Sequence, residues 1–246
     1  MKNNGSSDKV IVCTDLDGTL IGDDDSMYEL LEIADNKGIL VVFCTGRHLP
    51  AVTEFIEEKG VPEPDACTCL VGTEIYFPVE GELVLDERWS QIISEEWHRE
   101  EVEHLLEDVR ELQLQEAEWQ TRFKLSYYLK DNQPEVLKEV AERLENAKLK
   151  ANVIPSGGEL LDILPVNSGK AKATQYVADE LTINSDDVIV CGDSGNDLCM
   201  FKAGFKGIIV GNARDELKDF EGENAYHAKS GYSTGIIEGL EHFDII

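Results

Sequence analysis

The residues best suited to chemistry are four aspartates that follow apolar, strand-like stretches of the chain. Asp15 and Asp17 stand in TDLDGT. Asp193 and Asp197 stand in CGDSGND. Four carboxylates gathered at one place repel one another unless a cation holds them together. Because oxygen atoms would be the only ligands, with no histidine or cysteine among them, such a site favours the hard ion Mg²⁺.

A hydroxyl and a lysine supply the groups that a phosphate ester needs. Thr45 lies in CTGR, after another apolar run, and Lys170 lies in SGKAKA at the start of an expected helix. Lysine offers a compact positive charge, and the N–H groups at a helix start offer donors to phosphoryl oxygens. Since a carboxylate is a competent nucleophile toward phosphorus, these residues together indicate phosphoryl transfer.

Bringing these residues together requires a parallel sheet. Wholly apolar runs alternate with stretches of helical spacing, a pattern typical of parallel strands covered by helices on both faces. Ligands bind beyond the carboxyl ends of such strands. We therefore expect an α/β fold with a doubly wound core, in which strands at 9–14, 39–44 and 188–191 each carry a motif at the carboxyl end.

The middle of the chain has a different character. It mixes short strands with a long acidic helix expected at about 95–110 and a second helix at 134–147. Strand-rich hairpins among helices are typical of an α+β arrangement. We therefore expect a core made of residues 1–77 and 166–246, with an α+β domain inserted at 78–165.

The motifs together resemble those of a known superfamily. DLDGT, CTGR, a downstream lysine and GDSGND, in this order, are similar to the four signature motifs of the haloacid-dehalogenase-like (HAD) phosphohydrolases. An insert between the second and third motifs is similar to the larger α+β cap, the C2 type, of the Cof-like branch. The resemblance implies a Rossmann-like HAD core that carries such a cap, and a Mg²⁺-dependent phosphatase.

Carried over motif by motif, the resemblance implies a catalytic role for four residues. Asp15 resembles the nucleophile that forms an aspartyl-phosphate. Asp17 resembles the general acid that protonates the leaving oxygen and then, as a base, activates water. Thr45 and Lys170 resemble the pair that binds the phosphoryl group.

The same resemblance implies a set of Mg²⁺ ligands. These are Asp15, the backbone carbonyl of Asp17, and Asp193, with Asp197 bound directly or through water. The lysine motif, NSGKAKA, departs from the usual pattern because a further glycine is expected after the lysine. The departure leaves the positive charge in place.

Several further stretches resemble the sucrose-phosphate phosphatases: VGTEIYF, FKLSYYL, SGGELLDILP and CGDSGNDLCMF. This resemblance implies hydrolysis of sucrose 6-phosphate to sucrose and phosphate. The alternatives are a phosphatase for mannosyl-3-phosphoglycerate or glucosyl-3-phosphoglycerate, a phosphomannomutase, and a non-enzymatic module that binds Mg²⁺ and a sugar phosphate without turnover. Lys170 and Asp17 argue against the module, since a pure binder needs no proton shuttle beside the nucleophile.

Candidate contacts to the sugar lie in the insert and near the core motifs. Alternation along residues 123–129 puts Lys124 on the face that can meet a polyhydroxylated ligand. Asp162 interrupts an apolar strand and needs a partner, either Lys124 in an ion pair or sugar hydroxyls. Glu74 and Tyr76 are read as hinge residues or rim contacts, and Asn196 as touching substrate or loop backbone. The full set of candidate substrate contacts is Gly46, Arg47, Glu74, Tyr76, Lys124, Asp162 and Asn196.

The charge of the chain limits the classes of partner that it can bind. The 246 residues include 50 acidic and 22 basic side chains, a formal net charge of -28. Nucleic acid and an anionic membrane surface would be repelled by this charge, which suits a salt-rich cytoplasm or simply a well-solvated surface. No apolar run approaches the roughly 20 residues that span a bilayer, and the polar stretch 1–9 has no signal-peptide core.

We therefore expect a cytoplasmic monomer with a short frayed N-terminal tail at residues 1–9. Its partner would be a small sugar phosphate. The resemblance also makes a sucrose-phosphate synthase a candidate protein partner.

Overall fold

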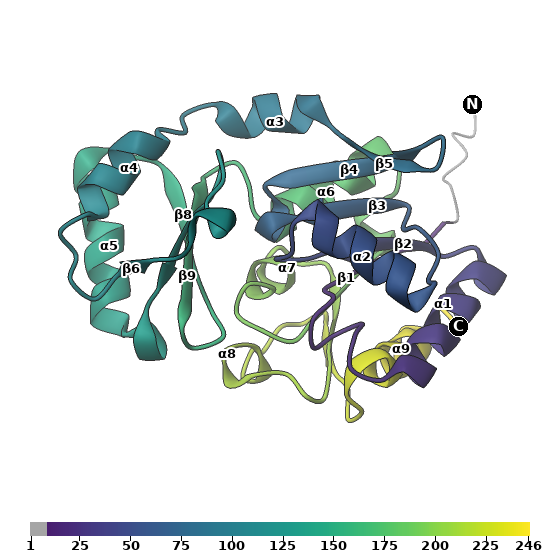
Figure 1. Cartoon of the computed structure of the whole chain (residues 1–246). Helices are drawn as coiled ribbons and strands as arrows, with labels where there is room; N and C mark the ends of the chain where they lie inside the picture. The colour runs from purple at the N-terminus through teal and green to yellow at the C-terminus, as the bar shows by residue number, and fades with distance from the viewer. Residues whose placement is uncertain (1–8) are drawn as a thin grey trace, which may run out of the picture. The chain divides into compact units, whose positions relative to one another are not determined.

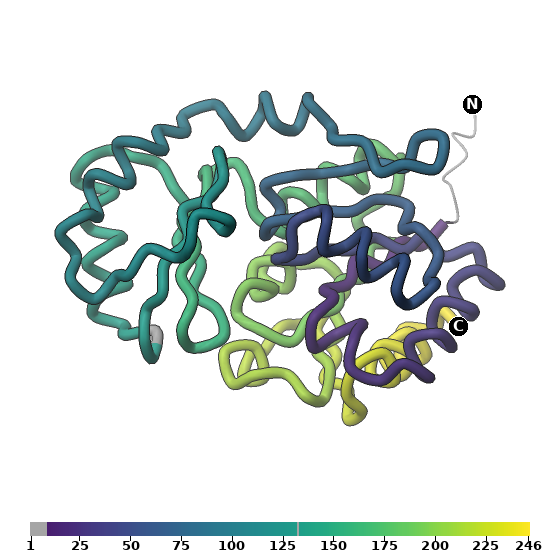
Figure 2. The backbone as a smooth tube through the Cα atoms, viewed as in Figure 1, coloured from purple at the N-terminus to yellow at the C-terminus, as the bar shows by residue number. Residues whose placement is uncertain are grey.

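The computed structural model describes residues 9–246, apart from the side chain of Asn132. Apart from Lys9, the tail expected at residues 1–9 lies outside the described residues. The chain forms two compact units. The core unit runs to Leu85 and resumes with Lys170–Ile246, and the insert unit is Asp86–Gly169. The backbone trace therefore leaves the core once and returns to it once (Figure 2).

An eight-stranded sheet forms the centre of the core unit (Figure 1). Its strands are β1 (Ile11–Thr14), β2 (Leu40–Cys44), β3 (Ala66–Cys69), β4 (Glu74–Val79), β5 (Glu82–Leu85), β10 (Val188–Gly192), β11 (Lys206–Ile209) and β12 (Ala225–His227). Their order is β12-β11-β10-β1-β2-β3-β4-β5. Neighbours from β12 to β3 are parallel, whereas β4 and β5 are antiparallel additions at one edge.

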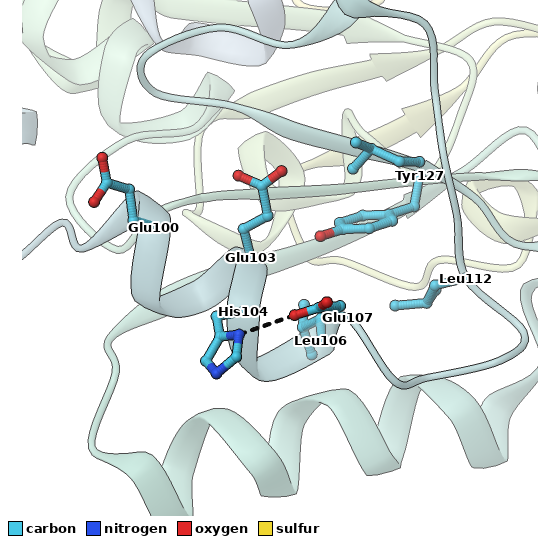
Figure 3. Close-up of a pocket in the computed structure, with 8 residues that line it drawn as sticks. Glu100, Glu103, His104, Leu106, Glu107, Leu112 and Tyr127 are labelled. Carbon is cyan, nitrogen blue, oxygen red and sulfur yellow. Dashed lines mark hydrogen bonds and ion pairs between the residues drawn. The ribbon is translucent and has the colours of Figure 1, made fainter.

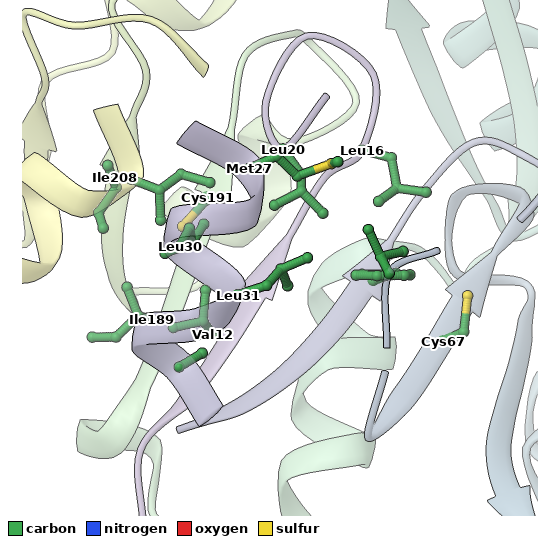
Figure 4. Close-up of a cluster of buried hydrophobic side chains, with 14 of the residues drawn as sticks. Val12, Leu16, Leu20, Met27, Leu30, Leu31, Cys67, Ile189, Cys191 and Ile208 are labelled. Carbon is green, nitrogen blue, oxygen red and sulfur yellow. The ribbon is translucent and has the colours of Figure 1, made fainter. Parts of the chain in front are cut away.

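Helices cover both faces of this sheet, as expected for a doubly wound core. They are α1 (Asp24–Lys37), α2 (Leu49–Lys59), α6 (Lys170–Glu180), α7 (Leu198–Lys202), α8 (Asp215–Lys218) and α9 (Tyr232–His242). On one face α1 packs against α9, and Leu30 and Leu31 of α1 lie over Val12 and Ile189 of the sheet (Figure 4). On the other face α6 packs against α7.

Local signals explain where the first helices end. Helix α1 begins at Asp24 because the side chain of Asp23 caps it by accepting the N–H of Ser26. Gly38 and Gly60 follow α1 and α2 in the left-handed conformation that ends a helix at low steric cost.

The boundary between the two units differs from the expected 78–165. Strands β4 and β5 form an antiparallel hairpin, with Tyr76 opposite Leu85, that extends the core sheet beyond β3. Residues 78–85 therefore belong to the core sheet. At the other end, the insert continues to Gly169.

The insert unit is an α+β arrangement around a four-stranded antiparallel sheet of order β6-β7-β9-β8. Its elements are α3 (Glu87–Ser94), α4 (Arg99–Leu106), β6 (Gln113–Leu114), β7 (Leu125–Tyr128), α5 (Pro134–Ala147), β8 (Ala151–Ser156) and β9 (Leu160–Pro165). Leu106 of α4 and Val140 of α5 share a buried core with Leu125 and Tyr127 of β7.

The helix expected at 95–110 is shorter than predicted, because α4 covers only Arg99–Leu106. The preceding helix α3, capped by the Asp86 side chain, was not predicted. Between them Glu96 has a φ of 61°, a left-handed conformation that a continuous helix cannot contain. No residue type in this acidic stretch indicated the turn at Glu96.

Within the described part of the chain, no helix is long and apolar enough to cross a membrane.

Candidate active site

The loop after β1 is folded tightly against the loop after β10. The Asp15 N–H donates to the carbonyl of Cys191 at 3.0 Å, which joins the ends of the two strands. Gly18 has a φ of 86°, and a Cβ atom there would lie 2.7 Å from Oδ2 of Asp193. Glycine is therefore needed in DLDGT both for the backbone conformation and for this close approach.

Three of the four predicted carboxylates meet at this edge of the sheet. Oxygen atoms of Asp15, Asp193 and Asp197 lie within 4.8 Å of one another. The three residues are 5%, 6% and 0% exposed. We call them the core triad.

The electrostatics of the core triad show how crowded its negative charge is. Burial raises the pKa of Asp15 well above its usual value; the charge of Lys170 opposes this rise, and the charges of Asp197 and Asp193 add to it. Burial, followed by the charge of Asp197, raises the pKa of Asp193 to about 6. A buried, oxygen-only cluster of this kind fits a hard divalent cation such as Mg²⁺.

Lys170 forms ion pairs with two members of the core triad. It is the first residue of α6 and is fully buried. Its Nζ lies 2.7 Å from Oδ1 of Asp15 and 2.6 Å from Oδ1 of Asp197. Burial alone would lower the pKa of Lys170, but the charges of Asp15 and Asp197 outweigh it and raise the pKa above its usual value. The lysine is therefore charged.

Both carboxylate oxygens of Asp197 already have protein partners. Oδ1 accepts from Lys170, and Oδ2 accepts the N–H groups of Asp193 and Ser194, each at 3.1 Å. This arrangement favours a contact between Asp197 and a bound cation through water. Gly192 allows the packing, because a Cβ atom there would lie 2.5 Å from Cβ of Asp197.

The side chain of Asp17 does not join the core triad, contrary to the expected convergence of four carboxylates. It is 59% exposed, and its Oδ2 accepts from Nε of Arg47 at 2.8 Å. The guanidinium binds the other oxygen as well, and hydrogen bonding to Asp17 raises the pKa of Arg47. The carboxylate turns outward because a cation from the loop after β2 meets it there. The predicted role of the Asp17 carbonyl is a separate matter and stays a prediction.

Thr45 follows β2, the neighbour of β1 in the sheet. It is fully buried, and its hydroxyl accepts the N–H of Arg47 at 3.1 Å. A Cβ atom on Gly46 would have open space within 4 Å. This loop therefore stands beside the strand that carries Asp15, with room at Gly46 for a group to approach.

Glu74 and Tyr76 lie within β4, well inside the core sheet, so the hinge interpretation is wrong. The Tyr76 hydroxyl donates to Oε2 of Glu74 at 2.6 Å. Burial, followed by this hydrogen bond, raises the pKa of Tyr76. Asn196 accepts from the Ser194 hydroxyl at 3.4 Å and so touches its own loop. A substrate contact by any of these residues stays a prediction.

The comparisons with known proteins identify the family. The profile of sucrose-6F-phosphate phosphohydrolases matches residues 8–244. The chain belongs to this family. It is thereby a HAD phosphohydrolase, of the class of phosphoric monoester hydrolases.

Relatives of the sucrose-6F-phosphate phosphohydrolase family align along almost the whole chain. The probable sucrose-phosphatase 2 of Arabidopsis thaliana is 32% identical, over 100% of this chain and 62% of that protein. The mannosylfructose-phosphate phosphatase of Agrobacterium fabrum is 29% identical, over 96% of this chain and 97% of that protein. This chain therefore spans less than two thirds of the plant protein but nearly all of the bacterial one.

Solved structures agree with the family. The sucrose-phosphatase of Synechocystis sp. PCC6803, solved with sucrose and phosphate, is 34% identical with a TM-score of 0.88 and covers 96% of this chain and 98% of its own. A haloacid dehalogenase-like hydrolase from Bacillus subtilis has a TM-score of 0.67 at 22% identity, covering 96% of this chain and 92% of its own. The second likeness supports the fold alone.

The insert of this family member contains the predicted partner of Asp162. Nζ of Lys124 lies 3.2 Å from Oδ1 of Asp162, and the two residues are 4% and 8% exposed. The hydroxyl of Ser126 donates to the same Oδ1 at 2.6 Å and accepts from Lys124 at 2.6 Å. The ion-pair interpretation of Lys124 and Asp162 is confirmed, and contact with sugar hydroxyls stays a prediction.

Two residues that support the core triad were missed from the sequence. Thr19, buried, donates its hydroxyl to Oδ1 of Asp193 at 3.3 Å. Asn212 donates from Nδ2 to the carbonyl of Gly18 at 2.7 Å and accepts the N–H of Tyr232 at 2.8 Å. Thr19 belongs to the DLDGT motif, which could have indicated it. Asn212 is far from Gly18 in sequence, and only the fold brings the two together.

Proposed function

We propose that this protein hydrolyses sucrose 6-phosphate to sucrose and phosphate through an aspartyl-phosphate on Asp15, in a Mg²⁺-dependent reaction. The observation that carries the proposal is the buried lysine, Lys170, between Asp15 and Asp197 at the carboxyl ends of parallel strands, in a member of the sucrose-6F-phosphate phosphohydrolase family. The likeness to a sucrose-phosphatase solved with sucrose and phosphate supports this choice of substrate.

In the first step, a carboxylate oxygen of Asp15 forms a bond to phosphorus as the bond from phosphorus to the sugar oxygen breaks. Asp17 gives its proton to that leaving oxygen. For this step the Asp17 side chain turns away from Arg47 and takes up a proton from solvent, which its exposure allows. Lys170 and Thr45 bind phosphoryl oxygens and offset their charge.

In the second step, water attacks phosphorus and the bond to Asp15 breaks. Asp17, now a carboxylate, takes the proton of the attacking water, so it ends the cycle as it began. Phosphate leaves, and Lys170 again pairs with the free Asp15 carboxylate. Closure of the insert as a cap would keep water out of the first step.

The chain's own groups fit a Mg²⁺ ion. Asp15 and Asp193 would hold it directly, together with the carbonyl of Asp17, and Asp197 would act through water. When bound, the ion would supply positive charge that offsets both the carboxylates and the phosphoryl group. Thr19 and the two N–H groups on Asp197 keep the ligand side chains in position.

A second candidate substrate is mannosylfructose phosphate. The Agrobacterium fabrum enzyme named for that substrate aligns with this chain over nearly the full length of both proteins. The two hexosyl-phosphoglycerates and phosphomannomutase activity stay as weaker alternatives, as does binding without turnover. Family membership favours hydrolysis over the last two.

Phosphate release tests the proposal. The substrates are sucrose 6-phosphate, mannosylfructose phosphate, the two hexosyl-phosphoglycerates and glucose 6-phosphate, each assayed with Mg²⁺ and with a chelator. We expect multiple turnover, a preference for sucrose 6-phosphate and loss of activity on chelation. A preference for mannosylfructose phosphate would make that molecule the proposed substrate in place of sucrose 6-phosphate. Formation of an isomeric sugar phosphate without phosphate release would show a mutase reaction in place of hydrolysis.

The proposal extends to the setting of the enzyme. We propose that it acts as a monomer in the cytoplasm and takes its substrate from a sucrose-phosphate synthase. Light scattering on a sizing column should give the mass of one chain, 27.4 kDa. A stable dimer would contradict the first statement.

A further inference from the structure

A groove in the insert unit is lined by residues that lie apart from the proposed active site. It has a volume of about 540 Å³, within the range of small-molecule sites. We call it the α4 groove (Figure 3). Its lining residues are Glu100, Glu103, His104, Leu106, Glu107, Leu112, Leu114 and Tyr127.

One wall of the α4 groove is a row of carboxylates along α4 and its cap. At 1.5 Å per residue, Glu100, Glu103 and Glu107 are about 4.5 Å and about 6 Å apart along the helix axis. Arg99 pairs with Glu103 at 2.6 Å, and His104 lies 2.9 Å from Glu107. These contacts offset part of the negative charge of the row, and the groove keeps an excess of negative charge.

The base of the groove is apolar and contains one polar atom. Tyr127 is only 5% exposed, yet its side chain lines the groove. Figure 3 shows the ring pointing inward, with its hydroxyl toward the side chains of the acidic row. Within residues 9–246, no hydrogen bond to this hydroxyl is present. The hydroxyl therefore faces the groove, where its hydrogen-bonding capacity is open to a ligand.

The hydroxyl keeps its proton. Burial raises the pKa of Tyr127 to about 12, and the nearby charge of Glu103 adds to the rise while that of Arg99 opposes it. The neutral phenol can therefore accept a hydrogen bond from a cation, and its ring offers a face to positive charge.

The groove is distinct from the predicted sugar face of the insert. Successive residues of a strand point to opposite faces of a sheet. Tyr127 packs in the core beneath α4 and α5, whereas its neighbour Ser126 contacts Lys124 and Asp162. A ligand in the groove would therefore occupy the helix-covered face, away from those polar residues.

We propose that the α4 groove binds a linear polyamine. The ammonium groups of such a molecule are separated by three or four methylenes, a spacing close to that of the carboxylates on α4. Its methylenes would pack on Leu106, Leu112 and Leu114. An ammonium group would donate to the Tyr127 hydroxyl. This site is additional to the proposed active site and does not depend on the proposed reaction.

Calorimetric titration with spermidine in about 0.15 M salt tests the proposal, because salt at this level screens diffuse attraction to an acidic surface. We expect one saturable site per chain. Glu100→Gln combined with Glu107→Gln should weaken binding about tenfold, through loss of charge-assisted hydrogen bonds. Tyr127→Phe should weaken it about threefold, the effect of one neutral hydrogen bond.

A matched control removes the same charge elsewhere. Glu29 and Glu32 are exposed and three residues apart on α1, in the core unit. Glu29→Gln combined with Glu32→Gln should change the affinity less than about twofold, since neither residue lines the groove and salt weakens diffuse attraction to exposed charges. A melting curve for each variant establishes that it is folded.

Three results would overturn the proposal. One is the absence of saturable binding by the wild-type chain. Another is equal weakening by the control pair, which would reveal general attraction to an acidic protein. The third is an unchanged affinity in folded Tyr127→Phe, which would show that any bound spermidine lies outside the groove.

Discussion

Each unit of this protein buries one lysine in contact with carboxylate groups, but the balance of charge differs between the two sites. In the core, Lys170 meets two of the three aspartates of the core triad. In the insert, Lys124 meets Asp162 alone, and Ser126 hydrogen-bonds to both. The core cluster has three formal negative charges for one positive charge, whereas the insert pair is balanced.

The comparison teaches how to tell a reactive cluster from a structural one. A balanced buried pair with its hydrogen bonds satisfied is complete, and removing one partner leaves a buried charge uncompensated. The core cluster has more negative than positive charge, and burial together with the charges of neighbouring aspartates raises the pKa values of Asp15 and Asp193. It gains stability from a further cation and is poised for chemistry.

The largest expected effect is a loss of kcat when the core triad is changed but not when the Lys124–Asp162 pair is changed. Asp15→Asn should lower kcat by about 10⁴-fold or more, because the amide cannot attack phosphorus. Asp162→Asn should leave kcat within about tenfold at a temperature where the variant is folded, since the proposed mechanism gives Asp162 no part in the reaction. Phosphate release from sucrose 6-phosphate measures both. Retained turnover in Asp15→Asn would remove the covalent mechanism.

The next effect concerns stability in the insert. Asp162→Leu should lower the free energy of unfolding by about 3–5 kcal/mol, because Lys124 is left buried without its partner. Lys124→Met combined with Asp162→Leu should recover most of the loss. Denaturant melts give both values.

The same variants show whether the insert pair also contacts the sugar. A double variant that recovers stability but has a raised KM with unchanged kcat would assign the pair to substrate binding. An unchanged KM would leave it a structural element.

A smaller effect concerns cation binding in the core. Mg²⁺ at a concentration about 100-fold above its Kd should stabilise the protein by about 2.7 kcal/mol, since it binds the folded triad. Asp193→Asn should remove most of this gain, while the double variant at Lys124 and Asp162 should keep it. Melting curves with Mg²⁺ and with a chelator measure the difference. Equal stabilisation of all three proteins would place the cation elsewhere.

The smallest effects come from the hydroxyls that support each cluster. Ser126→Ala should lower the free energy of unfolding by about 1–2 kcal/mol, because two charged neighbours lose a hydrogen bond. Thr19→Val should cost less, about 0.5–1 kcal/mol, since its bond to Asp193 is 3.3 Å long, but it should weaken Mg²⁺ stabilisation. If Ser126→Ala rather than Thr19→Val altered the response to Mg²⁺, the division between the two clusters would be wrong.

The core was more predictable than the insert. Apolar strands and capping glycines are local signals, and the strands expected at 39–44 and 188–191 are present as β2 (Leu40–Cys44) and β10 (Val188–Gly192). In the insert, helix α5 begins at Pro134 and ends at Ala147 as expected, but α3 was not predicted. The break between α3 and α4 depends on a backbone turn at Glu96, and in so acidic a stretch no residue type indicated it.

The sequence by itself determined which residues could do the chemistry. The aspartate motifs each follow a strand, and parallel strands bring their carboxyl ends to one edge of a sheet. Asp15, Asp193 and Asp197 could therefore be placed together from their positions after strands, whereas Lys170, at the start of a helix, was added as the cation that a phosphate site requires. The partner of Asp162 was also within reach, because a buried carboxylate needs a cation.

Only the tertiary structure decided the rest. It turned Asp17 outward to Arg47, added β4 and β5 to the core sheet, and placed Asn212 against Gly18. Each of these three features depends on which groups, distant in sequence, form a given hydrogen bond or pair with a given sheet edge. The packing of the whole unit decides this, so a local stretch of sequence does not predict it.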